Sequence, residues 1–96
     1  MSLELLAKTS PSVITAMYKY RHEVFKEGAM SVKEKELVAV AVSCVLKCDL
    51  CLETHADLAL KAGATKDEIR ESVLVAMYLS GPTSGIWSPI LDKYIK

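Results

Sequence analysis

Apolar residues recur at helical spacing along the chain, in segments that short polar or glycine-containing breaks separate. One such stripe has its members three or four positions apart: Val13, Met17, Tyr20 and Val24. Ser10-Pro11 precedes it and is typical of a helix start, because the fixed backbone angle of proline suits the first helical position. Gly28 is the expected stop of this helix. The same serine–proline signal recurs at Ser88-Pro89, where we expect a last helix to start.

Two capping boxes mark the starts of further helices. In this motif a serine or threonine accepts a hydrogen bond from the backbone three residues on, and the glutamate at that position returns one. Ser31 with Glu34 fits the pattern, and so does Thr65 with Glu68. The second box opens a helix that we expect to end at Gly81-Pro82.

The middle of the chain, residues 32–62, contains no Gly or Pro. As one helix it would be about 46 Å long, whereas a compact domain of this size is about 32 Å across. We therefore expect a break at Lys47-Cys48-Asp49, with Asp49 as the N-cap of a new helix that Gly63 closes.

The apolar run 37–46 fits a buried helix or a buried strand by periodicity alone. The capping box before it favours a helix, and no second strand-like run offers a pairing partner. The predicted fold is therefore all-α, with residues 1–96 forming one small helical domain.

Composition adds an expectation of self-association. The chain has 96 residues, of which 51% are hydrophobic. A small monomer cannot easily bury that much apolar material, and large exposed apolar patches usually mark contact surfaces. We therefore expect a homo-oligomer.

Charge and targeting signals argue against several classes of partner. Lys plus Arg and Asp plus Glu number 12 each, without a basic stripe, so we expect no nucleic-acid binding. The longest uncharged run, about 73–91, is interrupted by glycines and prolines, so we expect no membrane span. The N-terminal residues lack the layout of a signal peptide, which makes the cytoplasm the expected location.

The candidate chemistry lies in a stripe of cysteine and histidine. Cys44, Cys48, Cys51 and His55 are three or four positions apart, a spacing that shares one face of a helix. Cys48 and Cys51 form a C-x-x-C pair, in which one thiol can attack a mixed disulfide or a sulfenic acid on the other. A helix N-terminus at Cys48 would stabilise its thiolate, and His55 can accept the proton of Cys51. The spacing predicts reversible dithiol–disulfide cycling.

Other interpretations compete for the same residues. Cys44, inside an apolar run, is most simply a buried core residue. The three cysteines with His55 could be counted as zinc ligands, but ligands along one helical stripe cannot surround an ion. The Cys44-to-Cys51 spacing also matches the iron–sulfur motif of radical S-adenosylmethionine enzymes, whose barrels need about 200 residues or more. We therefore expect no metal and no cofactor, and we assign no role to His22.

The segment from Glu36 through Cys48-x-x-Cys51 to His55 resembles the signature of the alkylhydroperoxidase D-like proteins of the carboxymuconolactone decarboxylase family. The likeness extends over residues 31–73. The resemblance implies an all-helical domain that assembles through its helices, as a trimer or a hexamer. It also implies a hydroperoxide as the substrate and a dithiol protein as the reductant.

Carried over position by position, the resemblance makes Cys48 and Cys51 the redox pair, His55 the nearby base and Glu36 the far end of a proton relay. On one continuous helix Glu36 would lie about 28 Å from His55. It can reach the histidine only if the chain reverses near Cys48, so that an antiparallel helix pair carries the site. Taken alone, Glu36 is equally well an ordinary first-turn glutamate beside two lysines.

Two positions depart from the family pattern. Leu50 stands where the alkylhydroperoxidase pattern has a second histidine, which argues against a fast peroxidase. Lys47 stands where many members have glycine, and its charge could lower the pKa of a neighbouring thiol.

The first hypothesis is an enzyme, a peroxidase-like thiol–disulfide oxidoreductase in which Cys51 attacks the peroxide and Cys48 resolves the product. Proximity to His55 favours Cys51 as the nucleophile, and the helix N-terminus favours Cys48. One alternative is a carboxymuconolactone decarboxylase-type enzyme acting on a lactone acid, a branch that generally lacks the C-x-x-C pair. Another is a non-catalytic helical assembly module.

Overall fold

The computed structural model describes residues 2–96, and the regular structure within that range is helical. This confirms the all-α prediction. None of these helices combines the length and the apolar character that a membrane crossing requires. The elements are α1 (Ser2–Ala7), α2 (Pro11–Phe25), α3 (Val32–Leu46), α4 (Asp49–Lys61), α5 (Lys66–Ser80), α6 (Thr83–Ile86), the 3₁₀ turn η1 (Pro89–Leu91) and α7 (Asp92–Ile95).

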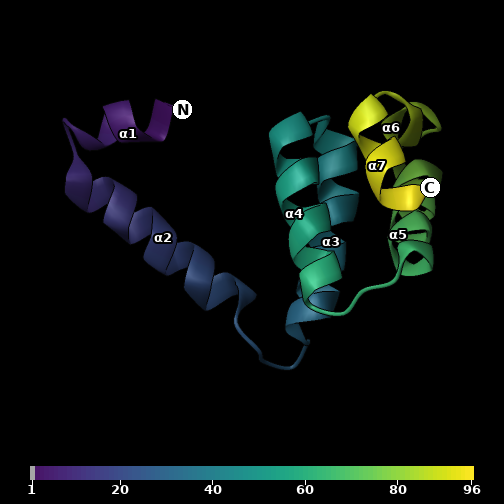
Figure 1. Cartoon of the computed structure of the whole chain (residues 1–96), viewed down its shortest axis with the longest axis horizontal. Coiled ribbons are helices and arrows are strands. Elements are labelled where there is room, and N and C mark those ends of the chain that lie inside the picture. Colours follow the sequence, from purple (N-terminus) through teal and green to yellow (C-terminus); the bar gives the residue numbers. More distant parts are fainter. Residues whose placement is uncertain (1) are drawn as a thin grey trace.

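The body of the molecule is built on α3, α4 and α5, with the short C-terminal helices covering one end (Figure 1). The helices α3 and α4 run antiparallel, as the site hypothesis requires, because the chain reverses between them. Side chains from α3, α4, α5 and the C-terminal segment meet in a single core cluster. Its buried members are Val40, Cys44, Leu52, Ala56, Ile69, Val73, Ala76, Leu91 and Tyr94.

Both predicted capping boxes are present. Ser31 Oγ accepts the Glu34 N–H at 3.1 Å, and Glu34 Oε1 accepts the Ser31 N–H at 2.8 Å. The Thr65–Glu68 pair repeats the arrangement at 3.0 and 2.9 Å. The helix that the second box opens ends at Ser80, before Gly81, as expected.

The break between α3 and α4 lies where the sequence predicts it, but its N-cap differs from the prediction. Lys47 adopts the left-handed conformation at φ 55° and ends α3. The N-cap of α4 is Cys48, not Asp49, because Cys48 has the extended backbone and its Sγ accepts the Cys51 N–H at 3.2 Å. Asp49 is instead the first helical residue, and its carboxylate accepts the hydroxyl of Ser88 at 2.6 Å.

The second helix, α2, ends earlier than predicted and lies apart from the body. It stops at Phe25 rather than near Gly28, because the Lys35 ammonium binds the carbonyls of Val24 and Lys26 at 2.9 and 2.7 Å. None of its residues is fully buried. In Figure 1, α1 and α2 diverge from the α3–α4 pair, and α2 approaches that pair at its C-terminal end. The radius of gyration, 14.5 Å, exceeds the roughly 12–13 Å expected of a compact domain of this length.

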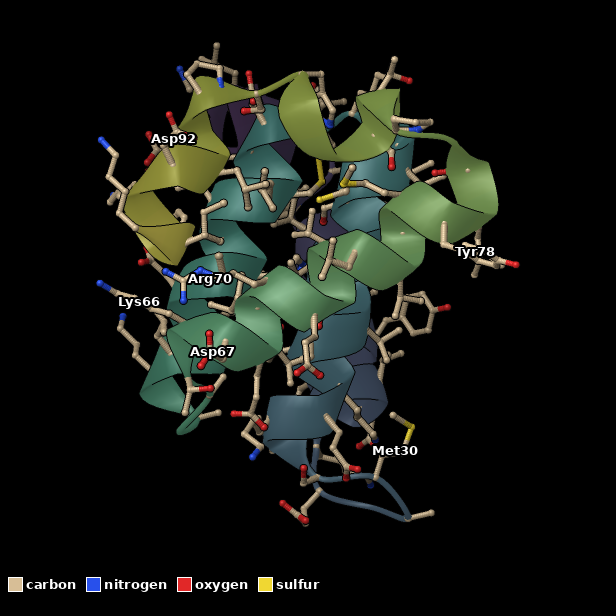
Figure 2. The ribbon with its side chains drawn as sticks, turned by 90° about the vertical axis from the view of Figure 1, so that its right-hand side faces the viewer. Met30, Lys66, Asp67, Arg70, Tyr78 and Asp92 are labelled. Carbon is tan, nitrogen blue, oxygen red and sulfur yellow. A yellow bond between two sulfur atoms is a disulfide. The ribbon has the colours of Figure 1, made fainter. Side chains whose placement is uncertain are left out.

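The C-terminal segment folds back along α5. The predicted last helix consists of η1 followed directly by α7, and the short α6 before them was not predicted. Arg70 on α5 lies between that helix and α7 in Figure 2. Its guanidinium pairs with Asp67 at 2.9 Å and donates to the carbonyl of Ile95. Tyr94 is buried in the core and donates from its hydroxyl to the carbonyl of Glu53 at 3.2 Å.

Candidate active site

The two cysteines of the C-x-x-C pair form a disulfide at the start of α4. Cys48 is the N-cap and Cys51 lies in the first turn, with 5.3 Å between their Cα atoms. Both residues are partly exposed. The geometry needed for a reversible dithiol–disulfide couple is therefore present at a position that solvent reaches.

The helix start gives the sulfur of Cys48 a polar partner. The N–H groups in the first turn of a helix have no partner within the helix, and they carry the positive end of its dipole. One of them, on Cys51, donates to Cys48 Sγ at 3.2 Å. In the reduced protein such an environment favours a thiolate over a thiol at Cys48.

His55 on α4 and Glu36 on α3 form a close pair. His55 Nδ1 lies 2.6 Å from Glu36 Oε1, and their side chains are 17% and 5% exposed. The pair joins α3 to α4. Glu36 reaches His55 because the two helices run antiparallel, as the site hypothesis requires. With Glu36 ionised, the imidazole holds its proton on Nδ1, which leaves Nε2 free as a base. His55 lies one helical turn beyond Cys51 on the same helix.

A residue that the sequence did not single out completes the surroundings of His55. The ring of Phe25, the last residue of α2, stacks on the imidazole with 5.2 Å between centroids and 18° between planes. Thirty positions separate the two residues in sequence. No motif or periodicity connects them, so this contact depends on where the chain places the end of α2.

The third cysteine, Cys44, belongs to the core and not to the redox pair. It is completely buried on α3, and burial raises the pKa of its thiol. Trp87 Nε1 donates to its backbone carbonyl at 3.2 Å. The chain reversal therefore divides the sequence stripe between two helices. Within the described range, no three His, Cys, Asp or Glu residues lie together as a metal would require.

A cavity of about 460 Å³ opens between α2 and the α3–α4 pair, at the Glu36 end of the site. Its lining combines charged and other polar side chains with apolar ones: Tyr18, Arg21, His22, Phe25, Lys26, Val32, Glu36 and Leu58. Leu50, in the place of the second family histidine, is 58% exposed. Of the predicted site residues, the structure links Cys48 to Cys51 and His55 to Glu36, and it places Cys51 and His55 one turn apart on α4.

The all-helical fold thus carries a C-x-x-C disulfide and a buried His–Glu pair on its α3–α4 helices. Comparison with known proteins gives the family. Residues 11–84 match the carboxymuconolactone decarboxylase family. The chain therefore belongs to the carboxymuconolactone decarboxylase family, and it resembles the alkylhydroperoxidase D-like members of that family.

Similar proteins come from several bacteria. An uncharacterized protein of the cox locus of Paracoccus denitrificans is 36% identical over 70 residues, covering 73% of this chain and 63% of that protein. The alkyl hydroperoxide reductase AhpD of Coxiella burnetii is 33% identical over 61 residues, covering 64% of this chain and 34% of that protein. The chain thus spans less than two thirds of either relative.

Solved structures show the same fold. A carboxymuconolactone decarboxylase family protein from Legionella pneumophila superposes with a TM-score of 0.86 at 26% identity, covering 99% of this chain and 88% of that one. A protein from Thermotoga maritima superposes with a TM-score of 0.79 at 24% identity, over 96% and 86% of the two chains. The second likeness concerns the fold alone.

Proposed function

We propose that this protein is a thiol–disulfide oxidoreductase that reduces organic hydroperoxides through Cys48 and Cys51. The observation that carries the proposal is the disulfide at the start of α4, one turn from a histidine that a buried glutamate pairs at 2.6 Å. Membership of a family that includes an alkyl hydroperoxide reductase supports it.

In the first step Cys51 attacks the peroxide. His55 Nε2 takes the proton of the Cys51 thiol, and Glu36 stabilises the imidazolium that forms. The thiolate then attacks the terminal peroxide oxygen, so that an S–O bond forms and the O–O bond breaks. The alkoxide that leaves takes the proton from His55 and departs as an alcohol, while Cys51 becomes a sulfenic acid.

In the second step Cys48 resolves the sulfenic acid. The thiolate of Cys48, stabilised by the first-turn N–H groups of α4, attacks the sulfur of Cys51. An S–S bond forms, the S–O bond breaks, and the departing hydroxide takes up the proton that Cys48 released. The two thiols have lost two electrons, and the peroxide has become an alcohol and water.

A dithiol protein then resets the couple by exchange, so the proposed partners are a hydroperoxide and a dithiol reductant. No cofactor enters the cycle. A cytoplasmic location, where dithiol reductants act, stays a prediction.

The test counts thiols after addition of peroxide to the reduced protein. We expect a loss of two thiols with complete recovery by dithiothreitol in the wild type, a loss of one thiol in Cys48→Ser, and no loss in Cys51→Ser. Trapping with a sulfenic acid reagent should label Cys51 in Cys48→Ser. The rate of thiol loss should fall about a hundredfold in His55→Ala and about tenfold in Glu36→Gln.

The control for Glu36→Gln is Glu53→Gln, which makes the same change at an exposed position of α4. Its rate should match that of the wild type. Thiols that survive an excess of peroxide unchanged would reject the peroxidase. They would favour the family's alternative, a decarboxylase-type enzyme for a lactone acid, or a non-catalytic assembly module.

We also propose that residues 1–96 act as one domain that assembles into a trimer or hexamer of identical chains. The apolar stripe of α2 is exposed in the single chain. On α3, an apolar groove of about 400 Å³ includes Val38 and Val42 in its lining, and a second of about 210 Å³ continues from Val42 toward Leu79 on α5. These surfaces offer the contact area that self-association needs.

A further inference from the structure

The C-terminal end of α2 covers one face of the imidazole of His55. Phe25 stacks on that ring nearly parallel, at 18° between planes. Phe25 is partly buried, whereas its neighbours on α2 from Thr15 to Val24 are exposed. The ring contact is therefore the point at which α2 meets the redox site.

The end of α2 that carries Phe25 is fastened to the helix that carries Glu36. The ammonium of Lys35 binds the carbonyls of Val24 and Lys26, one residue to either side of Phe25. Lys35 is the sequence neighbour of Glu36 on α3. One short stretch of α3 thus fixes the carboxylate at the edge of the imidazole and the aromatic ring above its face.

The two contacts restrain different motions of the histidine. The hydrogen bond from Nδ1 to Glu36 fixes one edge of the imidazole, but a single hydrogen bond leaves the ring free to tilt about it. A terminal torsion of this kind has a broad energy minimum, and a stacked ring of the observed geometry restricts it. Together, the hydrogen bond to Glu36 and the stacked ring of Phe25 fix the direction in which Nε2 of His55 points.

We propose that Phe25 is a positioning residue of the redox site, which holds His55 with Nδ1 toward Glu36 and Nε2 toward the dithiol. The inference rests on the proposed function for its role in catalysis, but the orientation of the ring is a property of the resting protein. In this arrangement α2 contributes to the site through the ring of Phe25, which stacks on His55.

The first experiment needs no turnover. The ¹⁵N shifts of the His55 ring in the oxidised protein report how the proton is shared between Nδ1 and Nε2. In the wild type we expect the Nδ1–H tautomer to dominate. In Phe25→Ala and Phe25→Leu the ratio of Nδ1–H to Nε2–H should fall by about twofold to tenfold, and Phe25→Tyr, which keeps the ring, should restore it.

The second experiment measures the reduced protein. The rate at which a neutral alkylating reagent labels Cys51 in a Cys48→Ser background should fall by about tenfold when Phe25 becomes Ala. Lys19→Ala is the control, because it truncates an exposed side chain of the same helix outside the apolar stripe. It should leave both the tautomer ratio and the labelling rate at the wild-type value.

The outcomes separate this inference from the proposed function. An unchanged tautomer ratio in Phe25→Ala and Phe25→Leu would overturn the positioning role, as would an equal change in Lys19→Ala. A wild type that leaves peroxide intact would reject the peroxidase, while the shifts would still decide the role of Phe25. Folding should survive the substitution, because Phe25 lies outside the core cluster.

Discussion

At the scale of single residues, the three thiols of this chain occupy different environments. Cys48 caps a helix, Cys51 lies within its first turn, and Cys44 is enclosed by the core. Reactivity of a thiol follows its ionisation and its access to solvent. Burial raises the pKa of the Cys44 thiol and shields it from solvent, so Cys44 should be the least reactive of the three cysteines.

Labelling with iodoacetamide tests this division. In the reduced native protein we expect two labels to appear by mass spectrometry, on Cys48 and Cys51, and the third only after denaturation. Raising the pH should speed the first two labels but leave Cys44 protected, because its access, as well as its protonation, limits the reaction. Three labels that appear at one rate would contradict the buried position of Cys44.

Lys47 pays a conformational cost at the turn between α3 and α4. Its φ of 55° is the left-handed conformation, which costs an ordinary L-residue roughly 1–2 kcal/mol. Glycine would avoid this cost while losing about 0.5–1 kcal/mol in chain entropy. We expect Lys47→Gly to raise the free energy of unfolding by about 0.5 kcal/mol, measured by denaturation in urea.

Lys47→Ala is the control for that substitution. It removes the same charge but keeps a Cβ in the left-handed region, so its stability should not exceed that of the wild type. Comparing thiol labelling in the two variants also tests whether the charge of Lys47 affects the cysteines. A slower rate in both variants would assign it that role.

The residues of the site differ in how far the sequence could predict them. Cys48, Cys51 and His55 lie within one helical segment, so local spacing sufficed. Glu36 was suggested by the family resemblance, and its role depended on a chain reversal, which the length of the uninterrupted segment predicted. Phe25 could not be predicted, because its contact with His55 joins two helices whose relative placement no local pattern specifies.

At the scale of elements, hydrogen bonds at the helix starts cap α3 and α5, and one of the capping residues also links these two helices. Glu68 accepts the Thr65 N–H and binds the ammonium of Lys33 at 3.0 Å, so the cap of α5 also joins it to α3. The hydrogen bond from Thr65 holds the pKa of Glu68 below its ordinary value, and Lys33 adds to the effect. In the same way, the Ser31 N–H lowers the pKa of Glu34.

A pH dependence of stability follows from these shifts. A carboxylate whose pKa is lower in the folded state stabilises the protein above its unfolded pKa, and that contribution is lost as the pH falls through the folded value. We expect Glu68→Gln to lower the Tm at pH 7 and to have no effect once the pH lies below the lowered pKa. Thermal unfolding followed by circular dichroism across this range measures the difference.

Glu71→Gln provides the control, because it makes the same change at an exposed position of α5 outside the capping box. Its Tm should follow that of the wild type at every pH. A Tm difference for Glu68→Gln that grows as the solution becomes more acidic would have the wrong sign for this explanation.

The elements themselves were predicted well where a start signal was local, and less well where an end depends on tertiary contacts. Both capping boxes were found from neighbouring residues alone, and the break at Lys47 from the length of the segment without Gly or Pro. The end of α2 was misplaced by three residues because Lys35, from the next helix, binds its last carbonyls. The short α6 has a glycine within it and no stripe to identify it.

At the scale of the whole molecule, the single chain leaves much apolar surface uncovered. The body packs around one core, but α2 extends away from it with Val13, Met17 and Tyr20 exposed. In Figure 2, Tyr78 projects outward from α5, and it is 89% exposed. The excess hydrophobicity of the composition is therefore located on α2 and on one face of α3 and α5.

Self-association through these surfaces makes a prediction that one substitution can test. Val38 lines the apolar groove on α3 and is half exposed, so a contact there would bury it fully. A carboxylate at that position would lose its hydration without gaining a partner, which costs several kcal/mol. We expect light scattering to give the wild type a mass of three or six times 10.5 kDa, and Val38→Glu a mass near 10.5 kDa.

The same experiment distinguishes dissociation from unfolding. Val38 is not part of the core cluster, so Val38→Glu should keep the helical circular dichroism spectrum of the wild type. Lys61→Glu adds a carboxylate at an exposed position of α4, away from both grooves, and should leave the mass unchanged. A wild type that stays monomeric at micromolar concentration would show that the exposed stripe of α2 and the groove on α3 do not bind a second copy of this chain.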